Sequence, residues 1–271
     1  MPITTDYHLH SEFSEDCNTP MEEMIKKALS LGMTHLCFTE HMDMDYPSDN
    51  PDGLSFLLDT HAYREKFLLL QEKYLNKITL LWGVELGIQP HITGKLTDYA
   101  LSHPFDFIIA SSHLLYGADP YYPSFFKHRD EEQVYGDYFS EIIKNIKSFP
   151  HFDVYGHLDY IVRYGPNKDS RYSYEKYRDL FDELLRTLIE NGKGLEINTG
   201  GLKYGLRNPH PHQEILLRYR QLGGEIITVG SDAHNTAYLQ YEFSTAAQLL
   251  SSCGFQYYTI FQNRKPMFIP L

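Results

Sequence analysis

Strand-like and helix-like segments alternate along nearly the whole of this 271-residue chain, and this alternation constrains its fold more than any other feature. Short runs rich in apolar, β-branched or aromatic residues predict strands at Ile3–His8, His35–Thr39, Ile78–Leu86, Phe105–Ser111, Phe152–His157, Gly194–Asn198, Ile226–Gly230 and Tyr257–Phe261. Segments with helical periodicity lie between them, at Thr60–Tyr74, Glu131–Phe149, Tyr174–Asn191, His212–Leu222 and Thr236–Ser252. The alternation predicts an α/β protein with a parallel sheet.

One more helix is predicted directly after the first strand. Thr19 is expected to cap its N-terminus, with Pro20 in the first turn and Glu22 as the glutamate of a capping box. Gly32 follows as the residue that ends the helix.

The number of strand–helix units favours a closed β/α barrel, because seven or eight units fit into 271 residues. An open doubly wound sheet is the alternative, but no GxGxxG turn follows the first strand to support it. The sequence contains no internal repeat or linker, so residues 1–271 are predicted to form a single domain. Two long loops, residues 42–59 and 114–130, follow strands and are candidate lids.

The charge balance of the chain argues against partners that are themselves strongly negative. Lys and Arg number 24 against 36 Asp and Glu, and the net charge of −12 argues against nucleic acid and anionic membranes as partners. The longest apolar runs, such as Phe67–Leu70, fall far short of the ~20 residues that span a membrane. Three cysteines without a CxxC pair, and no signal peptide, favour a cytoplasmic location.

The first predicted strand ends in the sequence Asp6-Tyr7-His8-Leu9-His10. Alternate side chains of an extended segment point the same way, so Asp6, His8 and His10 are expected to share one face. Two imidazoles at this spacing can reach one metal ion. The pair alone is a weak signal, since His210 and His212 repeat the spacing elsewhere.

The positions of other histidines and carboxylates strengthen the metal hypothesis. In β/α barrels the C-terminal ends of the strands meet at one mouth, where active sites are built. Such residues end or follow six of the predicted strands: His8 and His10, Glu40 and His41, Glu85, His113, His157, and Asp232 with His234. We therefore predict a metal site, and imidazole and carboxylate donors without thiolate suit zinc, manganese or iron.

Six ordered motifs resemble those of the PHP (polymerase and histidinol phosphatase) superfamily. They are DYHLH at 6–10, FTEH at 38–41, GVE at 83–85, SSH at 111–113, GHLD at 156–159 and GSDAH at 230–234. The chain length, the two loops and EINTGGLKYGLRNPHP at 196–211 are most similar to the monofunctional histidinol-phosphate phosphatases. The resemblance implies a distorted seven-stranded, TIM-like (β/α)7 barrel.

The resemblance also implies three divalent metal ions. The first would be held by His8, His10, Glu85 and Asp232, and the second by Glu85 as a bridge together with His113 and His157. Asp16, His41 and His234 would hold the third; some members of the superfamily have a histidine where Asp16 stands, and Glu12 and Glu15 are neighbouring alternatives.

The expected reaction is hydrolysis of the phosphate monoester L-histidinol phosphate, a step of histidine biosynthesis. A hydroxide held between the first two ions would attack phosphorus directly, and Asp232 or His234 would pass a proton to the leaving alkoxide. Arg163 and Arg207 are the predicted phosphate-binding residues, because a guanidinium pairs with phosphate oxygens in bidentate fashion. Lys168 is a weaker candidate.

The remainder of the substrate carries an imidazole and an ammonium group. Tyr121, Tyr122 and Phe125 are candidates to stack on the ring, and Glu12 or Asp159 to meet the ammonium. Alternative functions are another PHP phosphoesterase, such as a nucleotide phosphodiesterase or protein-tyrosine phosphatase, and a metal-dependent amidohydrolase. A metal-storage protein is the non-enzymatic alternative.

Overall fold

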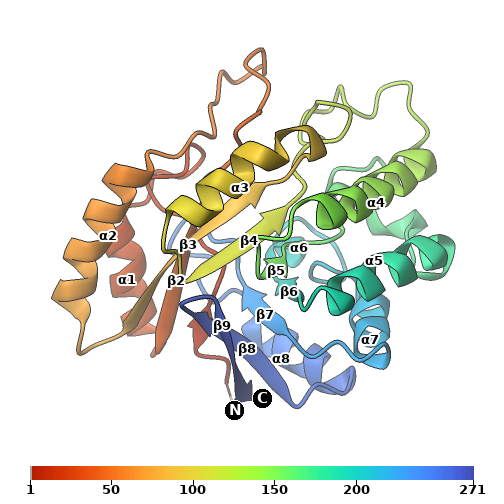
Figure 1. The fold of residues 1–271 in the computed structure, drawn as a ribbon. Helices are drawn as coiled ribbons and strands as arrows, with labels where there is room; N and C mark the ends of the chain where they lie inside the picture. The colour runs from red at the N-terminus through yellow and green to blue at the C-terminus, as the bar shows by residue number, and fades with distance from the viewer. Residues whose placement is uncertain (1) are drawn as a thin grey trace.

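The computed structural model describes residues 2–271 and contains a seven-stranded parallel sheet that curves into a nearly closed barrel (Figure 1). The strands follow chain order: β1 (Thr5–Asp6), β2 (His35–Met42), β3 (Thr79–Gly87), β4 (Phe107–Ser111), β5 (Val154–Tyr155), β6 (Gly194–Asn198) and β7 (Ile227–Gly230). The α-helices are α1 (Met21–Ser30), α2 (Thr60–Tyr74), α3 (Thr93–Ser102), α4 (Glu131–Ser148), α5 (Arg178–Glu190), α6 (Gly200–Lys203), α7 (Gln213–Gln221) and α8 (Phe243–Ser252). The predicted (β/α)7 barrel is confirmed, and the open sheet is excluded.

The barrel closes where the segments after β1 and β7 meet. Tyr7 N donates to Val229 O at 3.0 Å, and Asp232 N donates to His8 O at 2.7 Å. Asp6, which the sequence placed on the face of His8 and His10, is buried at this junction. Its carboxylate accepts from the backbone N–H and the hydroxyl of Ser231. The hydrogen bonds of Asp6 therefore connect β1 to the segment that directly follows β7.

The eighth predicted strand does not extend the barrel. It forms β8 (Tyr257–Gln262), which pairs antiparallel with β9 (Lys265–Pro270) in a separate hairpin. The sequence analysis missed β9, and it also missed α3. Gly94 and two threonines give α3 a weak helical pattern. Helix α8 begins at Phe243 rather than Thr236, because left-handed backbone at Gln240 and Glu242 interrupts the preceding segment.

The capping of α1 differs from the prediction. Thr19 Oγ1 donates to His234 O instead of accepting from the helix, and the Glu12 carboxylate accepts from Met21 N. Glu22 accepts from Tyr74 on α2 rather than completing a capping box. Gly32, with φ of +71°, ends the helix as predicted.

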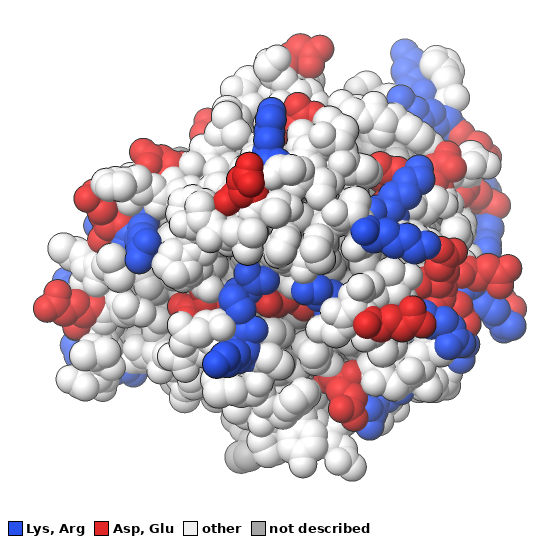
Figure 2. Space-filling model, viewed as in Figure 1, with Lys and Arg blue, Asp and Glu red and all other residues white. Residues whose placement is uncertain are grey.

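Charged side chains of both signs, Lys and Arg with Asp and Glu, are mixed on the face of the molecule that Figure 2 presents. None of the described helices is long and apolar enough to cross a membrane. Cys17, Cys37 and Cys253 are buried and form no disulfide within residues 2–271.

Candidate active site

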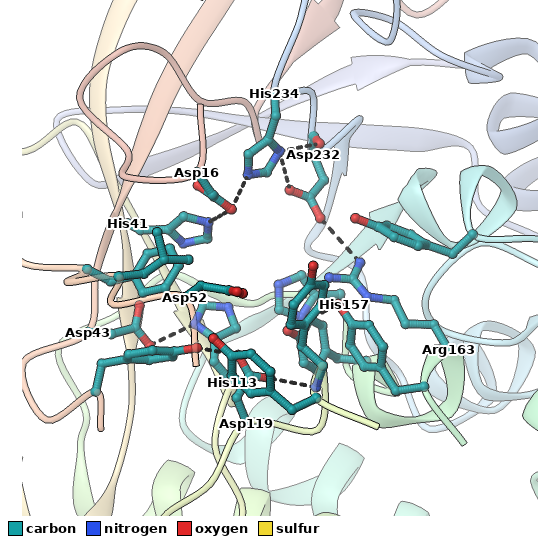
Figure 3. A pocket seen from close by; sticks show the side chains of 18 of the residues that line it. Asp16, His41, Asp43, Asp52, His113, Asp119, His157, Arg163, Asp232 and His234 are labelled. Atoms are coloured by element: carbon teal, nitrogen blue, oxygen red, sulfur yellow. Dashed lines mark hydrogen bonds and ion pairs between the residues drawn. The ribbon is translucent and has the colours of Figure 1, made fainter. Parts of the chain in front are cut away.

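The C-terminal ends of the strands bring the sequence-predicted donors to one mouth of the barrel, around a cavity of about 310 Å³ (Figure 3). A volume of this size fits a small-molecule ligand. The donors that line it are Asp16, His41, His113, His157, Asp232 and His234. His8, His10 and Glu85 lie beneath them and are fully buried.

Glu85, near the end of β3, contacts histidines from four other segments. Its Oε2 lies 3.2 Å from His8 Nε2 and 3.6 Å from His10 Nε2. Its Oε1 lies 3.1 Å from His113 Nε2 and 2.8 Å from His157 Nε2. His41 Nδ1 also lies 2.9 Å from Oε2. Both oxygens of one carboxylate thus face imidazoles, as a bridge between two ions must.

Asp232 completes the group around His8 and His10. Its Oδ1 lies 3.4 Å from His10 Nε2 and 3.8 Å from His8 Nε2. Donors about 2.1 Å from a tetrahedral zinc ion are about 3.4 Å apart, so these spacings suit one ion. Asp232 has a φ of 55°, a strained conformation that is typical of functional sites.

A third group lies nearer to solvent. Asp16 Oδ2 is 3.0 Å from His234 Nε2 and 3.7 Å from His41 Nε2. His41 also approaches Glu85, with Nδ1 at 2.9 Å from Oε2. Burial raises the pKa of Asp16, but the imidazoles of His41 and His234 outweigh this effect and lower it.

Several buried nitrogen and oxygen atoms of these groups have no hydrogen-bond partner among the described residues. Those that face another donor are Nε2 of His8, His10 and His234, Nδ1 of His41 and Oε2 of Glu85. Leaving such atoms unpaired costs about 1–3 kcal/mol each. Each one faces another donor across a gap that suits a divalent cation, so the residues fit a metal centre.

The pKa shifts of Glu85 and His10 agree with this fit. Burial raises the pKa of Glu85, but His8, His113 and His41 more than offset burial and hold the pKa well below its usual range. Burial and the neighbouring imidazoles of His41 and His234 lower the pKa of His10, which favours the neutral form that binds metals.

Residues that the sequence analysis did not select hold three of the imidazoles in place. Glu196 on β6 lies 2.7 Å from His8 Nδ1, and Asp43 lies 2.8 Å from His113 Nδ1. Ser14 lies 3.0 Å from His10 Nδ1. Carboxylate and hydroxyl partners on the far nitrogen commonly orient metal-binding histidines. Glu196 could have been found, because it lies on the predicted sixth strand two residues before its end.

Arg163 lies on the side of the cavity next to Asp232 (Figure 3). Its guanidinium stacks against Tyr160 and Tyr204, each 4.2 Å from the ring centroid, and NH1 is 3.6 Å from Asp232 Oδ2. Nε and NH1 are buried without hydrogen-bond partners. Lys203, which the sequence analysis did not select, also lines the cavity.

The structure does not bring Arg207 into the cavity. Its side chain is 75% exposed, and Nε lies 3.8 Å from Asp169. The turn of α6 directs Lys203 toward the cavity and leaves Arg207 on the surface. Lys168 is also outside, where it donates to Tyr204 O.

The two long loops contribute aromatic and acidic side chains to the cavity. Tyr121 and Tyr122 line it as expected, but Phe125 does not. Glu12 and Asp159 also lie outside it, because Glu12 accepts from Met21 N and Asp159 is buried against His210. The residues that the sequence analysis missed on these loops are Asp43, Tyr46, Asp52, Leu54, Phe56 and Asp119.

Comparisons with known proteins identify the family of this chain. Residues 6–200 match the PHP domain family. The histidinol-phosphatase of Lactococcus lactis is 31% identical over 261 residues, which cover 96% of this chain and 95% of that protein. A Clostridium acetobutylicum protein named "Probable histidinol-phosphatase" is also 31% identical, over 97% of this chain and 95% of its own length.

A solved structure extends the likeness to three dimensions. The L. lactis histidinol phosphate phosphatase, in complex with zinc, L-histidinol and phosphate, superposes with a TM-score of 0.88 at 30% identity. The match covers 98% of this chain and 99% of that one. With the family match and the barrel, these relatives show that the chain belongs to the PHP domain family and groups there with the histidinol-phosphatases.

Proposed function

We propose that this chain is a metal-dependent phosphomonoesterase that hydrolyses L-histidinol phosphate to L-histidinol and phosphate. The observation that carries the proposal is Glu85, whose two oxygens face two pairs of imidazoles beneath a cavity bordered by Arg163. The L. lactis relative, whose structure holds zinc, L-histidinol and phosphate, supports the choice of substrate.

Three groups of residues would hold three divalent ions. The first is His8, His10, Glu85 and Asp232, the second is Glu85, His113 and His157, and the third is Asp16, His41 and His234. Zinc is supported by the L. lactis complex. Manganese and iron accept the same nitrogen and oxygen donors, and the carboxylate in the third group suits a harder ion.

Bound ions would supply positive charge to the phosphoryl oxygens and make a bound water more acidic. Arg163 lines the cavity and would pair with the phosphate through its guanidinium group. A water made more acidic in this way would attack phosphorus directly, without a phosphoenzyme.

Asp232 is better placed than His234 to move a proton. His234 uses Nδ1 to contact Asp232 O and Nε2 to face Asp16. Asp232 directs Oδ1 toward the buried histidines, while Oδ2 faces Arg163 at the cavity. Oδ2 is therefore the oxygen that would accept a proton from water and return it to the alkoxide. Burial raises the pKa of Asp232, but His8, His10 and Arg163 outweigh burial and hold the pKa well below its usual range.

The proposal is tested by metal analysis of the purified protein together with steady-state kinetics on a panel of phosphate monoesters. We expect three ions per chain and the highest kcat/KM with L-histidinol phosphate. A metal-replete protein that hydrolyses no phosphate ester would overturn the assignment. A single turnover in ¹⁸O-water should place the label in the released phosphate, and unlabelled phosphate would exclude direct attack.

We also propose a cytoplasmic location, which the free thiols support.

A further inference from the structure

Glu40 is a buried carboxylate that the proposed mechanism does not use. It lies on β2 directly before His41, and its side chain is fully buried. It does not line the cavity, and no lysine, arginine or histidine among residues 2–271 forms an ion pair with it. A buried carboxylate without a counter-charge is costly unless hydrogen bonds satisfy its oxygens.

Two buried serines from the loop after β1 supply these hydrogen bonds. Ser11 donates from its backbone N–H to Glu40 Oε2 at 3.0 Å and from its hydroxyl to Oε1. The Ser14 hydroxyl donates to Oε2 at 2.6 Å. A turn holds the two serines together, since Ser14 N donates to Ser11 O at 2.9 Å. Burial raises the pKa of the Glu40 carboxyl, and these hydrogen bonds offset burial only in part.

The Ser14 hydroxyl has no hydrogen-bonding capacity to spare. A serine Oγ carries one proton and two lone pairs. The proton goes to Glu40 Oε2, and one lone pair accepts from His41 N at 3.1 Å. The other lone pair faces His10 Nδ1 at 3.0 Å. Because Ser14 has already donated its proton, Nδ1 of His10 must be the donor in this contact.

The direction of this hydrogen bond decides which nitrogen of His10 can bind an ion. With the proton on Nδ1, a neutral imidazole keeps the lone pair on Nε2. Nε2 is buried without a hydrogen-bond partner among residues 2–271, and it lies 3.4 Å from Asp232 Oδ1. If Ser14 instead donated its proton to Nδ1, the ring proton would move to Nε2 and block that nitrogen as a ligand.

We propose that Glu40 is a positioning residue for the metal centre. It fixes the direction of the Ser14 hydroxyl and thereby keeps Nε2 of His10 free to bind an ion. The proposal rests on the first group of metal donors in the proposed function and deepens it. Glu40 acts through Ser14 and His10, and not through contact with the substrate.

The zinc affinity of the full-length protein tests the proposal. Each variant is loaded with zinc and titrated with a chelator of known affinity, and the zinc that stays bound is measured by elemental analysis. Glu40→Met removes both acceptor oxygens, whereas Glu40→Gln retains one for Ser14. Glu131→Met is the matched control, because Glu131 is also buried and accepts three hydrogen bonds, none from a residue of the metal centre.

We expect Glu40→Met to lower the zinc affinity by about tenfold, since loss of an orienting partner typically costs about 10–100-fold. Glu40→Gln should stay within about threefold of wild type, because its amide oxygen still accepts the Ser14 proton. Ser14→Ala should lose as much as Glu40→Met, and the double variant no more than Ser14→Ala, because both changes break the same chain of hydrogen bonds. Glu131→Met should leave the zinc affinity unchanged.

Equal losses in Glu40→Gln and Glu40→Met would show that the charge of Glu40 matters and not its accepting oxygen, and they would overturn the proposal. Additive losses in the double variant would overturn it as well. If Glu40→Met does not fold, an unchanged zinc affinity in Ser14→Ala overturns it instead. In these cases the wild-type protein still binds zinc, and the proposed function stands. A wild-type protein that binds no divalent ion would overturn both proposals.

Discussion

Asp43 Oδ1 lies 2.8 Å from Nδ1 of His113, and this contact fixes which nitrogen of His113 faces Glu85. A carboxylate only accepts hydrogen bonds, so Nδ1 donates to Asp43, and Nε2 is the nitrogen directed at Glu85 Oε1, 3.1 Å away, where it would face a shared metal ion. Asp43 is 70 residues from His113 in the chain, and only the fold reveals the pair.

The variant Asp43→Ala should weaken metal binding at the second group. Loss of an orienting partner typically lowers metal affinity by about 10–100-fold. Titration with zinc, followed by calorimetry, checks this expectation. Asp43→Asn retains an acceptor oxygen and should lose less. Equal affinity in wild type and Asp43→Ala would show that His113 needs no orienting partner.

Arg163 and Arg207 provide a matched pair of substitutions. Arg163→Ala removes a buried guanidinium at the cavity and should lower kcat/KM for L-histidinol phosphate by about a hundredfold. Arg207→Ala changes an exposed side chain outside the cavity and should stay within about twofold of wild type. Steady-state kinetics on both variants measure these losses. A larger loss of kcat/KM in Arg207→Ala than in Arg163→Ala would show that the phosphate does not bind beside Arg163.

The metal donors could be predicted because their positions follow from backbone rules. His8 and His10 obey the alternation of a strand, and Glu85 and His157 lie near the ends of predicted strands in a barrel whose strand ends converge. Arg207 could not be placed in the same way. Its direction depends on the short helix α6, which the strand pattern does not specify.

Side chains on irregular segments were harder to predict. Asp119 and Tyr46 meet through a tertiary contact between two loops, and no periodicity of the sequence brings them together.

The fold itself was predicted except for two elements. Helix α3 was missed because its intrinsic propensity is weak, and β9 because its pairing depends on a hairpin outside the barrel.

The variant Glu85→Gln should reduce the metal content of the protein. An amide nitrogen has no lone pair to offer, so one of the two imidazole pairs around Glu85 loses its shared oxygen ligand. We expect at least one ion fewer per chain by elemental analysis, and a loss of activity on the order of 10³-fold because the phosphoryl charge is then less stabilised. Full metal content in this variant would exclude Glu85 as a bridge.

Asp182 on α5 provides a test of stability against pH. Arg218 on α7 and the Tyr174 hydroxyl bind this carboxylate, and they lower its pKa to about 2 from an ordinary value near 3.8. A depressed pKa in the folded state stabilises the protein above pH 4, and this contribution is lost as the pH falls through 2.

Asp182→Asn should therefore lower the free energy of unfolding by about 1 kcal/mol at pH 7, allowing for solvent screening of a partly exposed pair. The difference from wild type should be constant down to about pH 5 and shrink between about pH 4 and pH 2. Denaturant unfolding at a series of pH values measures it. Asp98→Asn, an exposed carboxylate on α3, is the control and should show no such change.

Gly87, the last residue of β3, makes room for the contact between Asp43 and His113. A Cβ at this position would lie only 1.9 Å from Asp43 Oδ1, so Gly87→Ala must displace the Asp43 carboxylate. We expect metal affinity to fall to the level of Asp43→Ala, and the double variant to lose no more than either single one, because both changes remove the same contact. Gly94→Ala on α3 meets no atom within 4 Å and should leave metal binding unchanged while it stabilises the helix by about 0.5–1 kcal/mol. Additive losses in the Gly87→Ala and Asp43→Ala pair would show that Gly87 acts on the metal centre by another route.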